Sequence, residues 1–322
     1  GCGVIAMDEL IWGWKGHQIS YTQIPPQNGS TACGRAVLCV HGFGASKGHW
    51  RHNLQTLAHD QWVYAIDLLG FGGSSKPLSR LVNEPETAGS VRYGFDLWAS
   101  QLVDFYREVI AATGPVTLQL IGNSIGGVVS LNAARMLSEG GQPPAQVVLI
   151  DCAERELDLK RLPEQPFGAQ LSRPLVMALV RQRWIVSNLF RFFARAGAVR
   201  AVLKQAYPSG GNVDDALVQL LLKPSQEPGA TESFRGFVNL FDDWLAPQLL
   251  ERLAVPVRML WGEADPWEPL EEARRWEQTF PCVQELEVLP GLGHCPHDEA
   301  PEQVNPILER WLQLGWDSPQ RA

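Results

Sequence analysis

The sequence predicts an α/β protein in which a mostly parallel central sheet carries helices on both faces and a helical cap is inserted between two strands of the core. Three observations predict this fold class. Short, wholly apolar runs alternate with segments of helical periodicity, as in a parallel sheet that is buried on both sides. A serine in a glycine-rich turn separates one such run from a helix. The stretch from 152 to 250 breaks the alternation and contains no convincing strand.

Length and composition set the limits of the prediction. A chain of 322 residues can form one large α/β domain with an insertion, or two ordinary domains. Hydrophobic residues make up 45% and charged residues 19%, which indicates a globular protein with a substantial core. The formal net charge of −8 argues against a nucleic-acid partner, because phosphate binding requires a basic face. No apolar run approaches the roughly 20 residues that a membrane-spanning helix needs.

The cysteines and the N-terminal segment favour a reducing, cytoplasmic environment. The six cysteines contain no C-x-x-C pair, and Cys39 lies inside an apolar strand, so we expect reduced thiols rather than disulfides or a metal site. The first residues lack the basic segment and apolar core of a secretory signal. Met7 is a candidate for the native start, which would make residues 1–6 an upstream remnant. The histidines show no metal-ligand spacing, and no sequence feature indicates an oligomeric state.

The elements of the first half follow from the apolar pattern. Strands are expected near 17–23, 36–41 and 62–67, followed by a helix near 95–112. This helix places Leu97, Leu102, Phe105 and Val109 on one side. The next strand is expected at 116–121, the following helix begins just after Ser124, and a further strand is expected at 146–151.

After an insertion, the second half of the sequence returns to alternating strands and helices. Strands are expected at 255–261 and 285–289, and a last helix at 301–314. The stretch between the two halves has helical periodicity interrupted by proline and glycine, which predicts a helical cap. The predicted division is therefore a first part of the core at 12–151, a cap at 152–250 and a second part of the core at 251–316.

The predicted cap has an unusual distribution of charge. No Asp or Glu occurs from 165 to 213, and apolar and aromatic residues alternate there with cations. The cations are Arg173, Arg181, Arg183, Arg191, Arg195, Arg200 and Lys204. One interpretation is a cap whose apolar face covers the active site. The other is a cationic amphipathic surface that rests on an anionic membrane or admits a lipophilic substrate.

Ser124 is the candidate nucleophile. It stands in Gly122-Asn123-Ser124-Ile125-Gly126-Gly127, a G-x-S-x-G pattern between a predicted strand and a predicted helix. The glycines allow a turn so tight that the serine takes a strained backbone conformation. The pattern alone is common by chance. Its position between a predicted strand and a predicted helix is what supports the assignment of Ser124 as a nucleophile.

A serine nucleophile needs a base, and the base needs a carboxylate that orients it. His294, in a loop just after the last predicted strand, is the candidate base, whereas His297 is assigned a structural role. Asp265, after the strand at 255–261, is the candidate acid. Asp151 is the alternative acid because it ends the preceding strand.

Two backbone N–H groups are candidates for stabilising the oxyanion of an acyl-transfer reaction. One belongs to Ile125, which follows the nucleophile, and the other to Phe43, which has a glycine on each side. His41 is expected to organise the loop that contains Phe43. Asp67 is expected to anchor a glycine-rich loop that lacks the G-x-G-x-x-G arrangement of a nucleotide site.

These segments together resemble the α/β-hydrolase superfamily, and more narrowly the pheophytinase and chlorophyll dephytylase group of plants and cyanobacteria. The segments are HGFGASKGHWRHN (41–53), DLLGFGGSSKP (67–77), YGFDLWASQLVDF (93–105), GNSIGG (122–127), WGEADPW (261–267) and GHCPHDEAPEQVNP (293–306). The last is the most distinctive of the narrower group, whereas the others are shared with dehalogenase-like and C–C bond hydrolases. The similarity covers roughly residues 12 to 312.

The resemblance implies a serine hydrolase that cleaves the phytyl ester of a chlorophyll pigment, with pheophytin as the first candidate. Ser124 would attack the ester carbonyl, His294 would transfer the proton, and Asp265 would orient His294. Phe43 and Ile125 would hold the oxyanion, and no cofactor or metal is implied. The location implied is cytoplasmic or peripheral to photosynthetic membranes. Asn123 stands where chlorophyllase is expected to have histidine, which argues against chlorophyllase itself.

Other activities of the same fold remain as alternatives. A serine at position 124 argues against haloalkane dehalogenase and epoxide hydrolase activity, because both need an aspartate nucleophile. A C–C bond hydrolase or a cofactor-free perhydrolase would use the same three residues. A non-catalytic ligand-binding member of the fold could also retain them.

Overall fold

Eight strands form a single sheet in the computed structural model, which describes residues 7–318. The strands are β1 (Leu10–Trp14), β2 (His17–Ile24), β3 (Arg35–Val40), β4 (Trp62–Ile66), β5 (Thr117–Asn123), β6 (Gln146–Ile150), β7 (Val257–Gly262) and β8 (Val283–Leu289). Their order across the sheet is β1-β2-β4-β3-β5-β6-β7-β8. β1 and β2 pair antiparallel with their neighbours, and the pairs from β4 to β8 are parallel. The predicted α/β fold class with a mostly parallel sheet is confirmed.

The predicted strands are all present, with ends shifted by at most two residues. β1 was missed by the sequence reasoning. It is an edge strand in which Trp12 and Trp14 are buried while Ile11 is exposed, and Gly13 interrupts its apolar pattern. A short strand with one solvated face carries a much weaker apolar signal than a central parallel strand.

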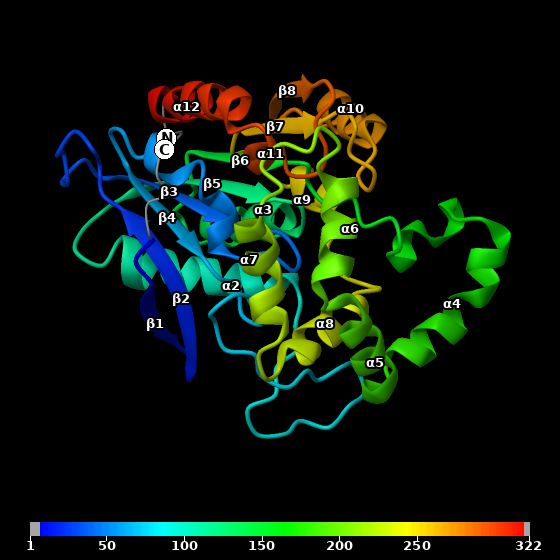
Figure 1. Ribbon diagram of the computed structural model, residues 1–322. Helices are drawn as coiled ribbons and strands as arrows, with labels where there is room; N and C mark the ends of the chain where they lie inside the picture. Colours follow the sequence, from blue (N-terminus) through cyan, green and yellow to red (C-terminus); the bar gives the residue numbers. More distant parts are fainter. Residues whose placement is uncertain (1–6, 319–322) are drawn as a thin grey trace.

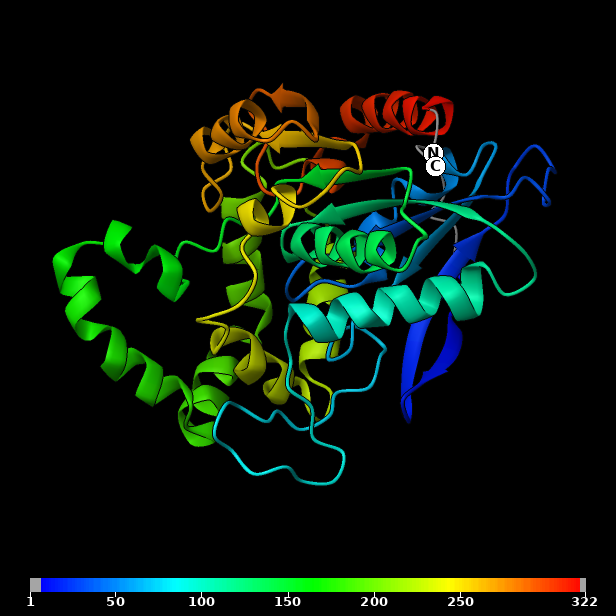
Figure 2. The ribbon, with the colours of Figure 1, turned by 180° about the vertical axis from the view of Figure 1, so that it is seen from behind.

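Side chains of the central strands alternate between two hydrophobic cores. On β3, Leu38 and Val40 face one core, and Val37 and Cys39 face the other. The first core is completed by α2 (Phe95–Phe105) and α3 (Ile125–Glu139), and the second by α1 (Leu54–Leu57) and α12 (Pro301–Asp317). Figures 1 and 2 show α12 on one face of the sheet and α2 with α3 on the other. Burial on both faces explains why these strands are apolar throughout.

The helix expected at 95–112 is divided in the structure. Its first part is α2, and the second is the π-helical turn η2 (Tyr106–Ile110). Other helices near the core are η1 (Lys47–Trp50), α10 (Leu270–Thr279) and α11 (Pro296–Glu299).

The chain between β6 and β7, all of it described, forms helices and no strand. The helices are η3 (Leu159–Glu164), α4 (Phe167–Val180), α5 (Arg183–Phe193), α6 (Ala196–Ala206), α7 (Asp215–Ser225), α8 (Ala230–Val238) and α9 (Ala246–Leu250). Figures 1 and 2 show α4 standing away from the rest of the molecule as an arm. Leu249 and Leu250 of α9 belong to the same core as α3. The division into a two-part core and a cap at 152–250 stays a prediction.

The cysteines of the described chain are free thiols, namely Cys33, Cys39, Cys152, Cys282 and Cys295. Cys2 and the proposed upstream remnant at 1–6 lie outside the described residues. Among residues 7–318, no helix has both the length and the apolar character needed to cross a membrane.

Candidate active site

Ser124 occupies the turn between β5 and α3, where its backbone has φ 56° and ψ −124°. A positive φ is uncommon for a residue with a side chain and marks a strained position. The neighbouring glycines permit it. A Cβ at Gly122 would lie 2.2 Å from the Gly126 carbonyl oxygen, and one at Gly126 would lie 2.4 Å from the Val40 oxygen. The G-x-S-x-G pattern is therefore required sterically for the turn that presents Ser124.

His294 and Asp265 form a buried imidazole–carboxylate pair. His294 Nδ1 lies 2.8 Å from Asp265 Oδ2, and the two side chains are 9% and 1% exposed. The other carboxylate oxygen accepts hydrogen bonds from the backbone N–H groups of Trp267 and Glu268, at 2.8 and 3.1 Å. The ring of Trp267 also packs edge-on against the imidazole, with centroids 4.9 Å apart. The turn after β7 thus fixes the carboxylate, and the carboxylate orients the imidazole.

Asn123 connects the histidine loop to the serine turn. Its Nδ2 donates hydrogen bonds to the carbonyl oxygens of His294, at 3.1 Å, and Ile150, at 3.0 Å. Ser124 and His294 line the same cavity. The residue before the serine therefore holds the backbone of the expected base beside the nucleophile, a role that the sequence reasoning did not assign to Asn123.

Burial and the mutual contact of His294 and Asp265 have opposite effects on the pKa values of these two side chains. Burial acts to lower the pKa of His294, but the hydrogen bond and charge of Asp265 outweigh it, so the pKa is raised. Burial acts to raise the pKa of Asp265, but the hydrogen bond and charge of His294 leave it below its ordinary range. The pair thus favours an ionised Asp265 and a more basic His294.

The rate of ester hydrolysis is expected to fall at acid pH, with an inflection above the value of about 6.5 for a free histidine. A general base must be neutral, and the raised pKa of His294 means that protonation removes the base as pH falls through that value. The profile of kcat/KM against pH for a water-soluble ester would measure it. An acid-side inflection below that of free histidine would contradict the assignment.

Asp151, the alternative acid, lies beside Asp265 rather than in its place. Its two carboxyl oxygens accept the N–H of Gly262, at 3.0 and 3.1 Å, and its side chain is fully buried. Burial raises the pKa of Asp151 well above its ordinary range, and the nearby charge of Asp265 raises it further. Both effects favour a protonated Asp151 that donates a hydrogen bond to Asp265. The carboxylate that contacts His294 is therefore that of Asp265 and not that of Asp151.

The same group offers three ligand atoms of the kind that bind metal ions. Atoms of Asp151, Asp265 and His294 all lie within 4.8 Å of one another. A metal ion ligated by Asp265 Oδ2 and His294 Nδ1 would have to replace the hydrogen bond that joins those two atoms. The arrangement is therefore better suited to orienting an imidazole than to holding a cation.

The loop that contains Phe43 packs directly against the serine. A Cβ at Gly42 would lie 2.9 Å from the Cβ of Ser124, so glycine is needed for this approach. Phe43 and Ile125 both line the cavity with Ser124. The ring of Phe43 stacks on Phe237 of α8, with centroids 3.9 Å apart. The structure therefore brings both expected oxyanion residues to the nucleophile.

His41 and Asp67 organise the loops beside the site, as expected. His41 Nε2 accepts the N–H of Leu68 at 3.0 Å, and Nδ1 lies 2.7 Å from the carbonyl oxygen of the next residue. Asp67 accepts the backbone N–H of Lys47 at 2.6 Å and that of Gly73 at 2.9 Å. Burial lowers the pKa of His41, which favours a neutral ring that fixes two loops.

A cavity of about 550 Å³ opens at Ser124 and is lined largely by apolar side chains. The helices between β6 and β7 supply much of its wall, including Val176 and Val180 of α4, Leu203 of α6 and Phe237 of α8. Such a cavity can hold the apolar part of a ligand beside the serine.

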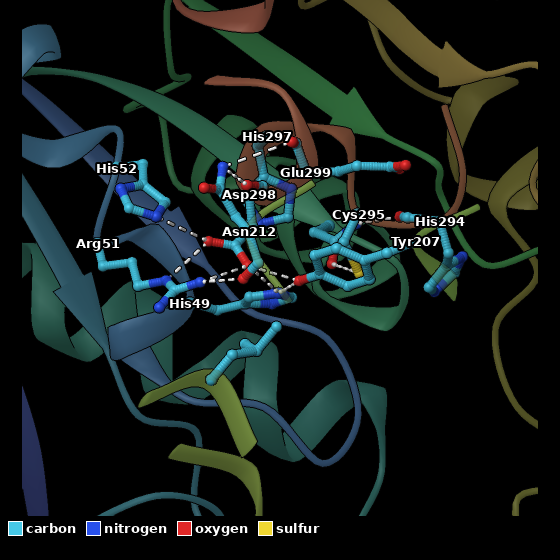
Figure 3. A network of polar contacts seen from close by, with 12 residues as sticks. His49, Arg51, His52, Tyr207, Asn212, His294, Cys295, His297, Asp298 and Glu299 are labelled. Carbon is cyan, nitrogen blue, oxygen red and sulfur yellow. Dashed lines mark hydrogen bonds and ion pairs between the residues drawn. The ribbon is translucent and has the colours of Figure 1, made fainter. Parts of the chain in front are cut away.

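A buried polar network borders the cavity, whose lining includes His49 and Tyr207 (Figure 3). Asp298, fully buried, accepts a hydrogen bond from Arg51 Nε at 2.9 Å and another from the hydroxyl of Tyr207 at 2.6 Å. The Tyr207 oxygen lies 2.7 Å from His49 Nε2, and burial lowers the pKa of His49 to about 4. Arg51 also pairs with Asp214 at 2.8 Å. The network joins η1, α11 and the link between α6 and α7.

Two neighbours extend this network. Glu299 accepts the N–H of Gly293 at 2.8 Å and that of Ser209 at 2.9 Å, so it ties the residue before His294 to the same link. The ring of His297 packs between Trp50 and His49, with centroids 4.4 and 4.8 Å away. His297 thus takes the structural position that was expected of it.

Replacing Asp298 with Asn is expected to lower the free energy of unfolding by about 3–5 kcal/mol, because it leaves the Arg51 guanidinium without its buried charge partner. Denaturant titration followed by tryptophan fluorescence would measure the loss. Arg310→Gln is a matched control, since Arg310 and Glu285 form a pair whose side chains are 55% and 36% exposed. The control should change the free energy by no more than about 1 kcal/mol. Equal effects of the two substitutions would contradict the role of the network.

A mostly parallel sheet with a serine at a strained strand–helix turn, beside a histidine–aspartate pair, defines the class of α/β-hydrolases. Residues 37–307 match the family described as "Alpha/beta hydrolase family". The chain belongs to this family.

Several proteins are similar to the chain over most of its length. Chloroplastic pheophytinase from Arabidopsis thaliana is 27% identical over 324 residues, covering 86% of this chain and 61% of that protein. The chain thus spans less than two thirds of that relative. The (lyso)-N-acylphosphatidylethanolamine lipase of Mus musculus is 24% identical over 290 residues, covering 85% of this chain and 78% of that protein. A solved serine hydrolase involved in carbazole degradation shares the fold, with a TM-score of 0.71 and 20% identity over 96% of this chain and all of that one.

Proposed function

We propose that the chain is a serine hydrolase that cleaves the carboxylic ester of a lipophilic substrate. The observation that carries the proposal is the buried pair of His294 and Asp265 at the cavity that Ser124 also lines. An ester-hydrolysing enzyme agrees with the family, whose members similar to this chain include proteins named pheophytinase and lipase.

The mechanism follows from these positions. Ser124 Oγ attacks the ester carbonyl while His294 Nε2 takes its proton, and Asp265 holds the Nδ1–H on the far side of the ring. The N–H groups of Phe43 and Ile125 stabilise the oxyanion, each worth about 3–4 kcal/mol. His294 then protonates the departing alcohol. Water, activated by the same histidine, releases the acid from Ser124.

The proposed substrate is the phytyl ester of pheophytin or chlorophyll. The similarity to pheophytinase supports it, and so does the apolar character of the cavity beside Ser124. A long isoprenoid chain needs an apolar wall, which Val176, Val180 and Phe237 supply. The proposal includes no cofactor, because the three side chains and the two N–H groups account for every proton and charge that moves.

The test is incubation with pheophytin and with chlorophyll, followed by chromatography of the pigments. Release of the dephytylated pigment by the parent chain but not by Ser124→Ala would support the proposal, and the preferred pigment would define the substrate. If neither pigment is cleaved, the phytyl substrate is wrong, and small esters and C–C bond substrates are the next to assay. Failure of Ser124 to react with a fluorophosphonate would instead favour a non-catalytic ligand-binding protein.

A further inference from the structure

Helix α4 exposes an apolar stripe on the side that faces away from the protein body. Phe167, Leu171 and Leu175 follow one another at four-residue spacing and are 74%, 66% and 63% exposed. Arg173 lies two residues from each leucine, on the opposite side of the helix, where it is buried and donates to the carbonyl oxygen of Leu157. Figures 1 and 2 show solvent space on the outer side of this arm. A stripe of large apolar side chains left open to water indicates a contact with something else.

Helix α5 continues the exposed surface with aromatic rings and cations. Trp184 and Phe192 are 68% and 57% exposed, whereas Val186, on the inner side of the helix, is fully buried. Arg191 lies on the outer side, two turns after Trp184 and about 20° from it in the helical projection. The guanidinium of Arg195 lies over the ring of Phe192, 5.3 Å from its centroid. Exposed tryptophan and phenylalanine beside arginine are typical of surfaces that enter the headgroup region of a bilayer.

The charge of this segment is opposite to that of the rest of the protein. From 165 to 213 the chain has no acidic residue, although the whole protein has a net charge of −8. Within the described chain, Arg191, Arg195 and Lys204 form no ion pair. Unpaired cations beside exposed apolar side chains favour an anionic partner with an apolar interior, and each cation near an anionic lipid surface contributes about 1 kcal/mol.

We propose that the outer cap face, made of Phe167, Leu171, Leu175, Trp184, Arg191 and Phe192, docks on the surface of an anionic lipid bilayer. The inner side of the same α4 carries Val176 and Val180, which line the cavity at Ser124. Docking therefore places one wall of that cavity against the membrane. An apolar ester dissolved in the bilayer would reach the cavity without crossing water. The route of entry rests on the proposed function, but the docking does not.

Flotation with vesicles tests the proposal. The parent chain should float with vesicles of phosphatidylcholine and phosphatidylglycerol, and much less with phosphatidylcholine alone. Leu171→Gln with Leu175→Gln should weaken binding roughly tenfold or more, because apolar area no longer enters the bilayer. Arg191→Glu should weaken it by a similar factor, and high salt should reduce binding of the parent.

The controls are exposed residues of the same kind on elements outside the proposed docking face. Ile11→Gln, at a position 57% exposed on β1, and Arg274→Glu, exposed on α10, should bind vesicles as the parent does. Circular dichroism would establish that each variant is folded. Equal binding by parent, cap variants and controls, or no binding to anionic vesicles, would overturn the proposal. A parent dimer in gel filtration that becomes monomeric with the two leucine substitutions would also overturn it, because a second copy would then cover the stripe.

Activity separates this proposal from the proposed function. The cap variants should hydrolyse a water-soluble ester at the parent rate in the absence of vesicles, because none of the substituted residues lines the cavity. Ester hydrolysis without membrane binding would remove the docking proposal alone. Membrane binding without ester hydrolysis would remove the proposed function and leave the docking surface.

Discussion

Ser124→Ala is expected to lower kcat for ester hydrolysis by about 10⁴-fold or more. Removal of the nucleophile of a serine hydrolase abolishes the covalent route, and what remains is the contribution of the oxyanion donors and of substrate binding. Initial rates with a water-soluble ester, supported by loss of fluorophosphonate labelling, would measure the effect. Substrate binding should persist, because the cavity wall is unchanged.

Ser138→Ala is the matched control for this experiment. Ser138 lies on the same helix, α3, near the end far from the cavity. Its replacement should leave kcat within about twofold, because Ser138 does not line the cavity at Ser124. A Ser124→Ala variant that keeps more than a hundredth of the parent rate would show that another group is the nucleophile.

Asp265→Asn is expected to lower kcat by about 10⁴-fold while leaving the fold intact. The amide is nearly the same size as the carboxylate, but it can present its N–H to His294 Nδ1 and so stabilise the wrong tautomer. The loss should appear in kcat more than in KM, because the interaction matters most when the imidazole becomes charged. Steady-state kinetics on a small ester would separate the two.

Asp151→Asn is the comparison that distinguishes the two carboxyl groups. Because the environment of Asp151 favours its protonated form, an amide can replace it as a hydrogen-bond donor to Asp265. We therefore expect the rate to stay within about tenfold of the parent. A loss from Asp151→Asn as large as that from Asp265→Asn would indicate that Asp151 shares the role of the acid.

The parallel part of the fold was predictable because its signal is local. In β3 and β6 nearly every side chain is buried, so each strand appears in the sequence as an uninterrupted apolar run. The turn at Ser124 was also predictable, since its glycines are required by backbone contacts with Val40 and Gly126. The edge strand β1 offered only two buried tryptophans and was missed.

The polar support of the site could not be predicted in the same way. Arg51 and Asp298 are separated by 247 positions, and Asn123 and His294 by 171, so nothing local in the sequence indicates these contacts. Some signal was present, because Arg51 and Asp298 belong to the segments at 41–53 and 293–306 that carried the family resemblance. Their roles became apparent only when the fold placed them together.

The cap illustrates a different limit. Its sequence allowed either a helix that covers the active site or an exposed amphipathic surface, and α4 combines features of both. Val176 and Val180 line the cavity, whereas Leu171 and Leu175 face outward. A helix that is apolar nearly all round has no clear inner side in the sequence, so only the fold can assign one.

The polar attachments of the predicted cap are unequal along its length. The link between α6 and α7 is held by Arg51 and Glu299, close to His294, whereas the arm that contains α4 is joined to the rest of the protein through backbone carbonyl groups such as those of Leu157 and Arg181. Changes near the first attachment would disturb the base. The arm at 165–182 should therefore be exchangeable for another segment. Such an exchange should change the preferred length of the substrate chain and the preferred lipid surface, and it should leave the chemistry at Ser124 unchanged.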